Sequence, residues 1–161
     1  LYGFRRDAAF AKREWKVEGT ITDIAAIDGS DRVVLGIYGG EVALLDTSRE
    51  GADAVLWRQM ACPDQSVRVA LAPDGSRIAV CGKNPVVRIL DASDGQQVLA
   101  LGGHGDAVLS LAFSPDGSTL ATGAIDGTVR IWRAAAGGFA FASGETAPDA
   151  AQRGFRSSGP R

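Results

Sequence analysis

The chain has 161 residues, of which 45% are hydrophobic and 22% are charged, with 21 glycines and a formal net charge of −2. This length excludes a large multidomain enzyme, and the balanced composition excludes a collagen, an acidic disordered tail and a coiled coil. The abundant glycine and the 7% aromatic content favour many turns over long helices.

The charges are unevenly distributed along the chain. Residues 1–16 hold five basic side chains against two acids, and residues 150–161 hold three arginines and no acid. The segment between them therefore carries 9 basic against 17 acidic residues. Because nucleic-acid affinity comes mainly from neutralised phosphates, this acidic excess predicts that nucleic acid is not a partner.

The N-terminal segment, residues 1–16, differs in pattern from the rest of the chain. Its apolar residues fall at spacings of three and four, which fits a short helix, whereas the run 10–17 fits equally well the outer strand of a preceding sheet. The chain begins at Leu1 and its one methionine is Met60, so we expect it to be a fragment of a longer chain or a processed piece.

From residue 17 onward the sequence repeats. The run Pro-Asp-Gly-Ser at 73–76 recurs 42 residues later at 115–118, and a displacement of 45 residues relates the first copy to the second. Three copies result, at about 20–58, 65–101 and 107–142.

Each copy has the pattern of a small antiparallel sheet. Apolar and polar residues alternate at 109–113 and at 129–132, which predicts short strands. Pro-Asp-Gly at 115–117 and Asp-Gly at 126–127 predict tight turns between strands. Each copy supplies three clear strands and a weaker fourth. The sequence therefore predicts an all-β fold, with three four-stranded antiparallel blades that form an incomplete β-propeller.

The third copy resembles the WD40 repeat family almost position for position. The matching runs are Gly-His at 103–104, Leu-Ala-Phe-Ser-Pro-Asp-Gly at 111–117, Leu-Ala-Thr-Gly at 120–123 and Asp-Gly-Thr-Val-Arg-Ile-Trp at 126–132. Arg133 stands where the family has Asp after Trp. The first two copies are degenerate but keep the period and the turns, so the resemblance covers roughly residues 17–142.

The resemblance implies a hydrogen-bonded structural tetrad inside the third blade, made of His104, Thr122, Asp126 and Trp132. The corresponding positions are Cys62, Val80, Asn84 and Leu90 in the second copy, and Val17, Leu35, Gly39 and Leu45 in the first. Those two blades must rely on apolar packing instead.

The sequence predicts no catalytic residues, cofactor or metal site. The one histidine of the chain is already engaged in the tetrad that the resemblance implies. Asp-rich runs at 28–31 and 91–95 lack the spacing and the terminal Glu of a calcium loop, so we interpret them as turns. Cys62 and Cys81 form no CxxC motif and are interpreted as buried free thiols.

A partner-binding face is also implied by the resemblance. The contact face of WD40 proteins is commonly built from the loop that enters each first strand and the loop between the second and third strands. The corresponding residues here are Tyr38, Lys83, Ile125, Asp64 and Asp106. Variation at these positions fits either partner contact or simple exposure to solvent, and the sequence leaves both open.

The function implied by the resemblance is that of a non-catalytic scaffold, which binds peptides or protein domains on the propeller face and helps assemble a complex. The alternative is a sensor or regulatory segment of a larger enzyme whose catalytic domain lies outside this chain. Three blades leave two open edges, so we expect the remaining blades to come from the parent chain, a partner or self-association.

The remaining expectations concern location and the C-terminal end. No apolar run reaches the length of a membrane span and no signal sequence opens the chain, so we expect a cytoplasmic or nuclear protein without a membrane partner. Residues 143–161 are rich in Gly, Ser, Ala and Arg and are predicted to be a flexible tail.

Overall fold

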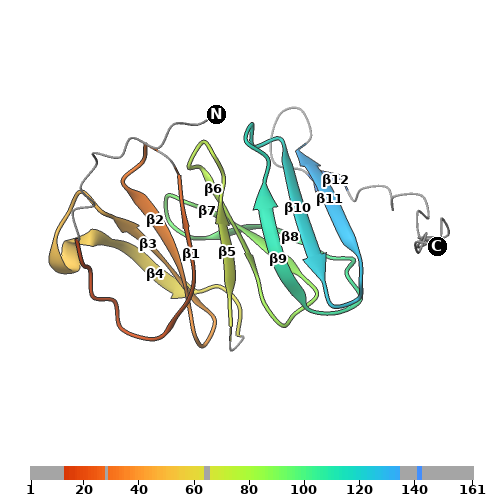
Figure 1. Ribbon diagram of the computed structural model, residues 1–161, viewed down its shortest axis with the longest axis horizontal. Coiled ribbons are helices and arrows are strands. Elements are labelled where there is room, and N and C mark those ends of the chain that lie inside the picture. Colours follow the sequence, from red (N-terminus) through yellow and green to blue (C-terminus); the bar gives the residue numbers. More distant parts are fainter. Residues whose placement is uncertain (1–12, 28, 64–65, 135–140, 143–161) are drawn as a thin grey trace, which may run out of the picture.

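The computed structural model describes residues 13–27, 29–63, 66–134 and 141–142. Within these residues the chain forms three antiparallel sheets, which stand side by side in the order of the sequence (Figure 1). The predicted all-β fold is therefore confirmed, as an open row of blade-like sheets. The described part of the chain contains no helix long and apolar enough to cross a membrane.

The first sheet has the strand order β1-β2-β3-β4. Its strands are β1 (Ile21–Ala26), β2 (Arg32–Ile37), β3 (Glu41–Asp46) and β4 (Val55–Met60), with a short 3-10 helix, η1 (Gly51–Ala54), before the last of them. The apolar runs along β2 and β3 are long enough that both strands are almost wholly buried.

The second and third sheets repeat this meander. The second consists of β5 (Arg68–Leu71), β6 (Arg77–Cys81), β7 (Val87–Asp91) and β8 (Gln97–Leu101). The third consists of β9 (Val108–Phe113), β10 (Thr119–Ala124), β11 (Val129–Ala134) and the short β12 (Phe141–Ala142). The predictions for residues 1–12 and 143–161 fall outside the described residues.

The predicted Pro-Asp-Gly turns have a local chemical cause. Gly75 and Gly117 adopt φ values of 72° and 70°, which glycine reaches without steric cost. In the turn of the third sheet, Asp116 accepts a hydrogen bond from the backbone N–H of Ser118 at 3.1 Å. Hydrogen bonds from Ser114 and then Ser118 hold the pKa of Asp116 at about 2, so this turn keeps its carboxylate charged at neutral pH.

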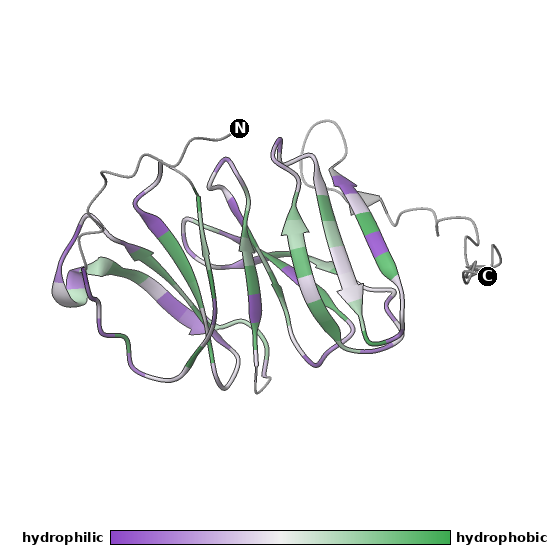
Figure 2. Cartoon of the chain, viewed as in Figure 1, coloured by the Kyte–Doolittle hydropathy of each residue, from purple (hydrophilic) through white to green (hydrophobic). Residues whose placement is uncertain are grey.

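Two hydrophobic clusters join the sheets to one another. The first lies between the first two sheets and contains Val34, Val42 and Leu44 from one side and Val69, Ile78 and Leu90 from the other. The second lies between the second and third sheets and contains Ala79, Val87, Ile89, Leu120 and Trp132. Figure 2 shows hydrophobic stretches along the strands of all three sheets, interrupted by hydrophilic bands. The sheets are therefore held together mainly by face-to-face apolar packing.

A polar contact supplements this packing between β1 and β5, the innermost strands of the first two sheets. Thr22 donates its hydroxyl to the carbonyl of Val67 at 2.9 Å, and the N–H of Val69 donates to Asp23 Oδ2 at 2.9 Å. Gly36, which pairs with Asp23, lies close to the same carbonyl: a Cβ at this position would stand 2.8 Å from Val67 O. We call these contacts the inter-sheet clasp.

Replacing Gly36 with Ala should lower the free energy of unfolding by about 1–3 kcal/mol, because the new methyl group overpacks against a backbone carbonyl that cannot rotate away. Chemical denaturation of the purified chain measures this. Gly102→Ala is the matched control, since a Cβ there meets nothing within 4 Å. Equal effects of the two substitutions would show that the close approach at Gly36 has no energetic weight.

Candidate functional site

The third sheet carries a buried network of polar side chains. His104, in the loop before β9, is 6% exposed, and Thr122 on β10 is 1% exposed. The Nε2 atom of His104 lies 2.8 Å from Thr122 Oγ1, and Trp132 Nε1 donates to the same oxygen at 2.9 Å. Leu120 pairs with Trp132, so β10 and β11 place these side chains on the face that packs against the second sheet.

Asp126 completes the network from the turn after β10. Its Oδ2 atom is 3.3 Å from His104 Nδ1 and accepts the N–H of Gly105 at 2.6 Å. Carboxylate oxygens only accept, so in a neutral imidazole Nδ1–H donates to Asp126 while Nε2 accepts the Thr122 hydroxyl. A continuous chain of donors thus runs from the Trp132 indole to the Asp126 carboxylate.

A fifth residue, Thr128, joins the network and was not anticipated from the sequence. Its hydroxyl lies 3.0 Å from His104 Nδ1 and donates to Asp126 Oδ1 at 2.6 Å. The available signal was the spacing of two residues after Asp126, at which a Ser or Thr hydroxyl closes a local turn. Thr128 therefore fixes the carboxylate on the side opposite Gly105.

The equivalent positions in the other sheets are mostly apolar. In the second sheet Cys62, Val80 and Leu90 all belong to the cluster between the first two sheets, and Asn84 accepts a local hydrogen bond from the N–H of Val86. In the first sheet Leu35 and Leu45 form a third cluster, against which Val17 packs. Of the three sheets, only the third links its four positions by hydrogen bonds among the described residues.

The sequence-predicted face residues lie in equivalent turns. Tyr38 follows β2, Lys83 follows β6 and Ile125 follows β10, at the same end of each sheet. All three are exposed, with 53% of Tyr38 and 57% of Ile125 accessible. Asp106 is exposed in the loop that enters β9, and the predicted Asp64 lies outside the described residues.

Two further exposed apolar residues stand at this end of the molecule. Ile21 begins β1 and is 48% exposed, and Leu109 is 55% exposed near the start of β9. Alternation alone would put Leu109 on the same face as Leu111. A shift in register between Gly123 and Ala124 turns it outward instead, because a β-bulge breaks the two-residue period. We refer to Ile21, Tyr38, Lys83, Leu109 and Ile125 as the loop-end face.

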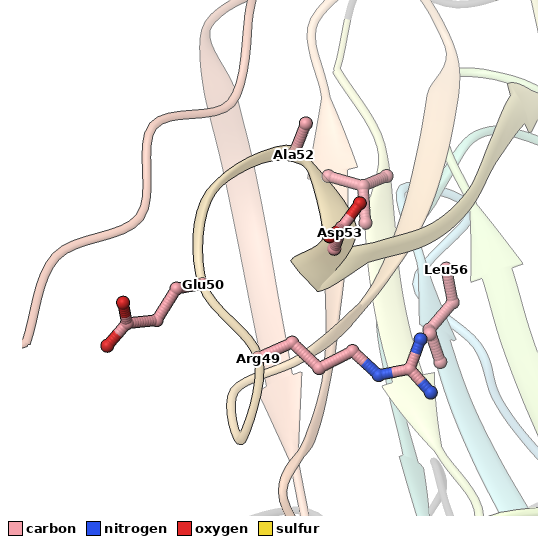
Figure 3. Close-up of a pocket in the computed structure, with 6 residues that line it drawn as sticks. Arg49, Glu50, Ala52, Asp53 and Leu56 are labelled. Carbon is pink, nitrogen blue, oxygen red and sulfur yellow. The ribbon is translucent and has the colours of Figure 1, made fainter.

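A polar hollow lies away from this face, beside the loop between β3 and β4. Figure 3 shows that Arg49 and Glu50 point in opposite directions there, with Arg49 extended alongside Leu56. Arg49 forms an ion pair with Asp46 at 3.1 Å. No group of three or more metal-ligating side chains occurs among the described residues. The hollow is wide open and its charged groups do not converge on a common point.

The two buried cysteines do not suggest a reactive thiol. Cys62 and Cys81 are both buried and do not form a disulfide. Burial raises the pKa of the Cys81 thiol to about 12, so it stays protonated at neutral pH and is a poor nucleophile.

Acid should weaken the network through Asp126. Hydrogen bonds from the Thr128 hydroxyl, and then from the backbone of Gly105 and Thr128, hold the pKa of Asp126 well below its usual range. A carboxylate whose pKa is lower in the folded than in the unfolded state adds stability above about pH 4, and this contribution is lost as the pH falls further. We therefore expect Asp126→Asn to be less stable than the wild type at neutral pH, with the difference shrinking between about pH 5 and pH 2. Denaturation midpoints across this range measure it, and a difference independent of pH would contradict the assignment.

The comparisons agree with the geometry of the third sheet. Residues 95–133, about a quarter of the chain, match the family model described as WD domain, G-beta repeat. No curated protein matches the chain. The matched residues run from the turn before β8 through β11 and include His104, Thr122, Asp126 and Trp132. Residues 95–133 are thus similar to a WD repeat of the G-beta type, and they lie in a row of three antiparallel sheets that is consistent with WD40 blades.

Proposed function

We propose that this chain is a non-catalytic interaction scaffold, which binds peptides or protein domains on the loop-end face and helps assemble a complex. The observation that carries the proposal is the exposure of large side chains at equivalent turns, above all Tyr38 and Ile125. Aromatic and bulky apolar side chains provide most of the binding energy in protein interfaces, and a turn on a rigid sheet holds them in a fixed position.

The charge of this face fits a polypeptide partner of mixed character. Lys83 and Asp106 are both exposed beside the apolar side chains. Single charges around an apolar centre are typical of the polar rim of an interface, where they contribute more to specificity and association rate than to affinity. Asp64 belongs to the same proposed face by its place in the repeat.

The network of the third sheet is proposed to be structural. Both nitrogens of His104 are engaged by Thr122, Asp126 and Thr128, and its side chain is buried. A general base must reach a substrate proton, and this imidazole lies inside the sheet packing. Its buried donors and acceptors instead fix the relative positions of β10, β11 and the loop before β9.

The described sheets do not close into a ring. We propose that further blades complete the propeller, supplied by the parent chain, by a partner or by self-association. The site needs no cofactor, metal, nucleic acid or membrane for this mode of binding, and the proposed location is the cytoplasm or the nucleus.

Replacing His104 with Ala should lower the free energy of unfolding by about 1–3 kcal/mol, because Thr122 and Asp126 lose a buried hydrogen-bond partner. Thermal and chemical denaturation measure this, with the exposed Lys83→Ala as control. A variant of unchanged stability that had lost a catalytic rate measured in the wild type would show that His104 serves chemistry instead.

Binding on the loop-end face can be tested with peptides enriched from a random library on the immobilised wild-type chain. Tyr38→Ala and Lys83→Ala should each weaken binding of these peptides by about 1–2 kcal/mol, while stability changes by less than about 0.5 kcal/mol. Isothermal titration calorimetry measures the affinities. The matched control is Val98→Ala, which removes a 48% exposed apolar side chain from the outermost strand β8.

The opposite pattern would overturn this location. If affinity is unchanged by both substitutions and abolished by Val98→Ala, the partner binds the outer side of the sheets and not their loop ends.

A further inference from the structure

The outward face of the third sheet is apolar and uncovered. Cross-strand pairs place Ala112, Ala121 and Ile131 in one row, and Ser110, Gly123 and Val129 in the next. Val129 is 70% exposed and Ile131 is 44% exposed. These two rows surround a shallow, mainly apolar hollow. We call the six residues the open face.

The β10 and β11 positions of this face are buried in the other two sheets. The β9 positions differ, since their equivalents in the second sheet, Arg68 and Ala70, are exposed and half-buried. Val87 and Ile89, which lie 42 residues before Val129 and Ile131, are each 0% exposed beneath the third sheet. Their counterparts in the first sheet, Val42 and Leu44, are 0% and 1% exposed beneath the second. The open face therefore has the side chains of an inter-sheet contact and lacks only its neighbour.

The open face also keeps part of the inter-sheet clasp. In the first sheet Asp23 pairs with Gly36. Asp23 accepts the N–H of Val69, and Gly36 lies against the carbonyl of Val67. In the third sheet Ser110 pairs with Gly123 at the equivalent place, and each pair directly adjoins a shift in register. A hydroxyl thus stands in place of the carboxylate, beside a glycine at which a Cβ would lie 2.9 Å from Ser110 Oγ.

At the opposite end of the row, residues 13–17 cover part of the first sheet, and the contact of Trp57 with the second sheet shows which strand they replace. Trp57, on the outermost strand β4, donates its indole N–H to Ala92 O at 2.9 Å, in the loop after β7 of the next sheet. Trp15, 42 residues earlier, donates to Arg49 O at 2.9 Å, in the loop after β3. Residues 13–17 therefore occupy the place of an outermost strand that belongs to a sheet preceding β1.

The inner part of that first sheet lacks a cover. Trp15 and Val17 pack on the cluster that contains Leu35 and Leu45. On β1, however, Ile24 is 63% exposed, although its counterpart in the second sheet, Val69, is 5% exposed. The first sheet thus lacks a neighbouring sheet that would cover β1. That sheet must supply its own inner strands, whereas residues 13–17 supply its outermost strand.

The third sheet meets this description. β12 pairs with Arg133 and Ala134 of β11, and no described strand pairs with the outer edge of β11 before Arg133. Residues 13–17 of another molecule would lie along that edge when the open face covers β1. The two incomplete ends are complementary in both apolar surface and strand content.

We propose that two copies of this chain close a six-blade ring, in which the open face of each copy packs on β1 of the other. Residues 13–17 of each copy lie beside residues 129–132 of the other, the part of β11 that β12 does not pair with. Both contacts are identical and head-to-tail, so a two-fold axis closes the ring, and six blades fall within the four to eight that propellers use. The inference rests on the proposal that further blades complete the propeller, and names their source.

The mass of the full chain in solution tests the ring. Size-exclusion chromatography with multi-angle light scattering should give twice the 16.7 kDa of one chain. Val129→Lys and Ile24→Glu should each give the mass of a single chain, because either places a charge in an apolar contact. Circular dichroism should show that both remain folded, since the two side chains are exposed in the single chain. Val98→Glu, which changes an equally apolar residue on β8 outside the contact, should keep the double mass.

Mixing the two variants gives the sharper test. In a ring made of one Val129→Lys copy and one Ile24→Glu copy, one contact pairs Lys with Glu and the other is wild type. The equimolar mixture should therefore recover the double mass that neither variant shows alone. A wild-type chain of single mass, a ladder of higher multiples, or no recovery on mixing would overturn the ring.

Failure of the ring can be told apart from failure of peptide binding. Tyr38→Ala lies outside both contacts and should keep the double mass while losing affinity for peptide. A single-mass chain whose peptide affinity still depends on Tyr38 would reject the ring and retain the loop-end face.

Discussion

Each sheet of this chain is apolar on both faces, so no sheet can bury its own surface. Val34, Val42 and Leu44 are buried only because the second sheet covers them, and Val87 and Ile89 only because the third does. Apolar burial scales with the area removed from water, so each added sheet stabilises the one before it. This dependence on neighbours sets the row-like architecture and leaves exposed apolar surface at the two ends of the row.

Two kinds of interaction fix the sheets once they are in the row. The first two sheets use apolar side chains at the positions where the third uses His104, Thr122 and Trp132. Apolar packing tolerates small displacements, whereas a buried hydrogen-bond network costs free energy if any member is displaced. The third sheet therefore has the most strictly defined geometry, and its strands β9, β10 and β11 lie almost wholly within the residues that match the WD repeat model. The turn that carries Ile125 directly precedes Asp126, so the network also positions one of the exposed residues of the loop-end face.

Much of the fold follows from local features of the sequence. The 42-residue period, the two-residue alternation and the Asp-Gly turns each act within a few residues, and the structure has strands and turns at those places. Gly75 and Gly117 show why this works: the positive φ of a turn is decided by the residue itself. Four of the five residues of the hydrogen-bonded network were also indicated by the resemblance of the third copy to the WD40 repeat, and Thr128 was not.

Contacts between distant segments were decided only by the tertiary structure. Val129 and Val87 occupy the same position of the repeat, yet one is 70% exposed and the other fully buried, because burial depends on whether another sheet lies in front. A bulge turns Leu109 outward. Trp15 donates a hydrogen bond to the carbonyl of Arg49, 34 residues away, and no local pattern indicates this contact. The sequence by itself determined the strands and turns of the repeating unit, which depend on short-range geometry, and its resemblance to the WD40 repeat indicated four of the five residues of the network. The packing of the units determined which apolar faces are left exposed, because that depends on surfaces brought together from separate parts of the chain.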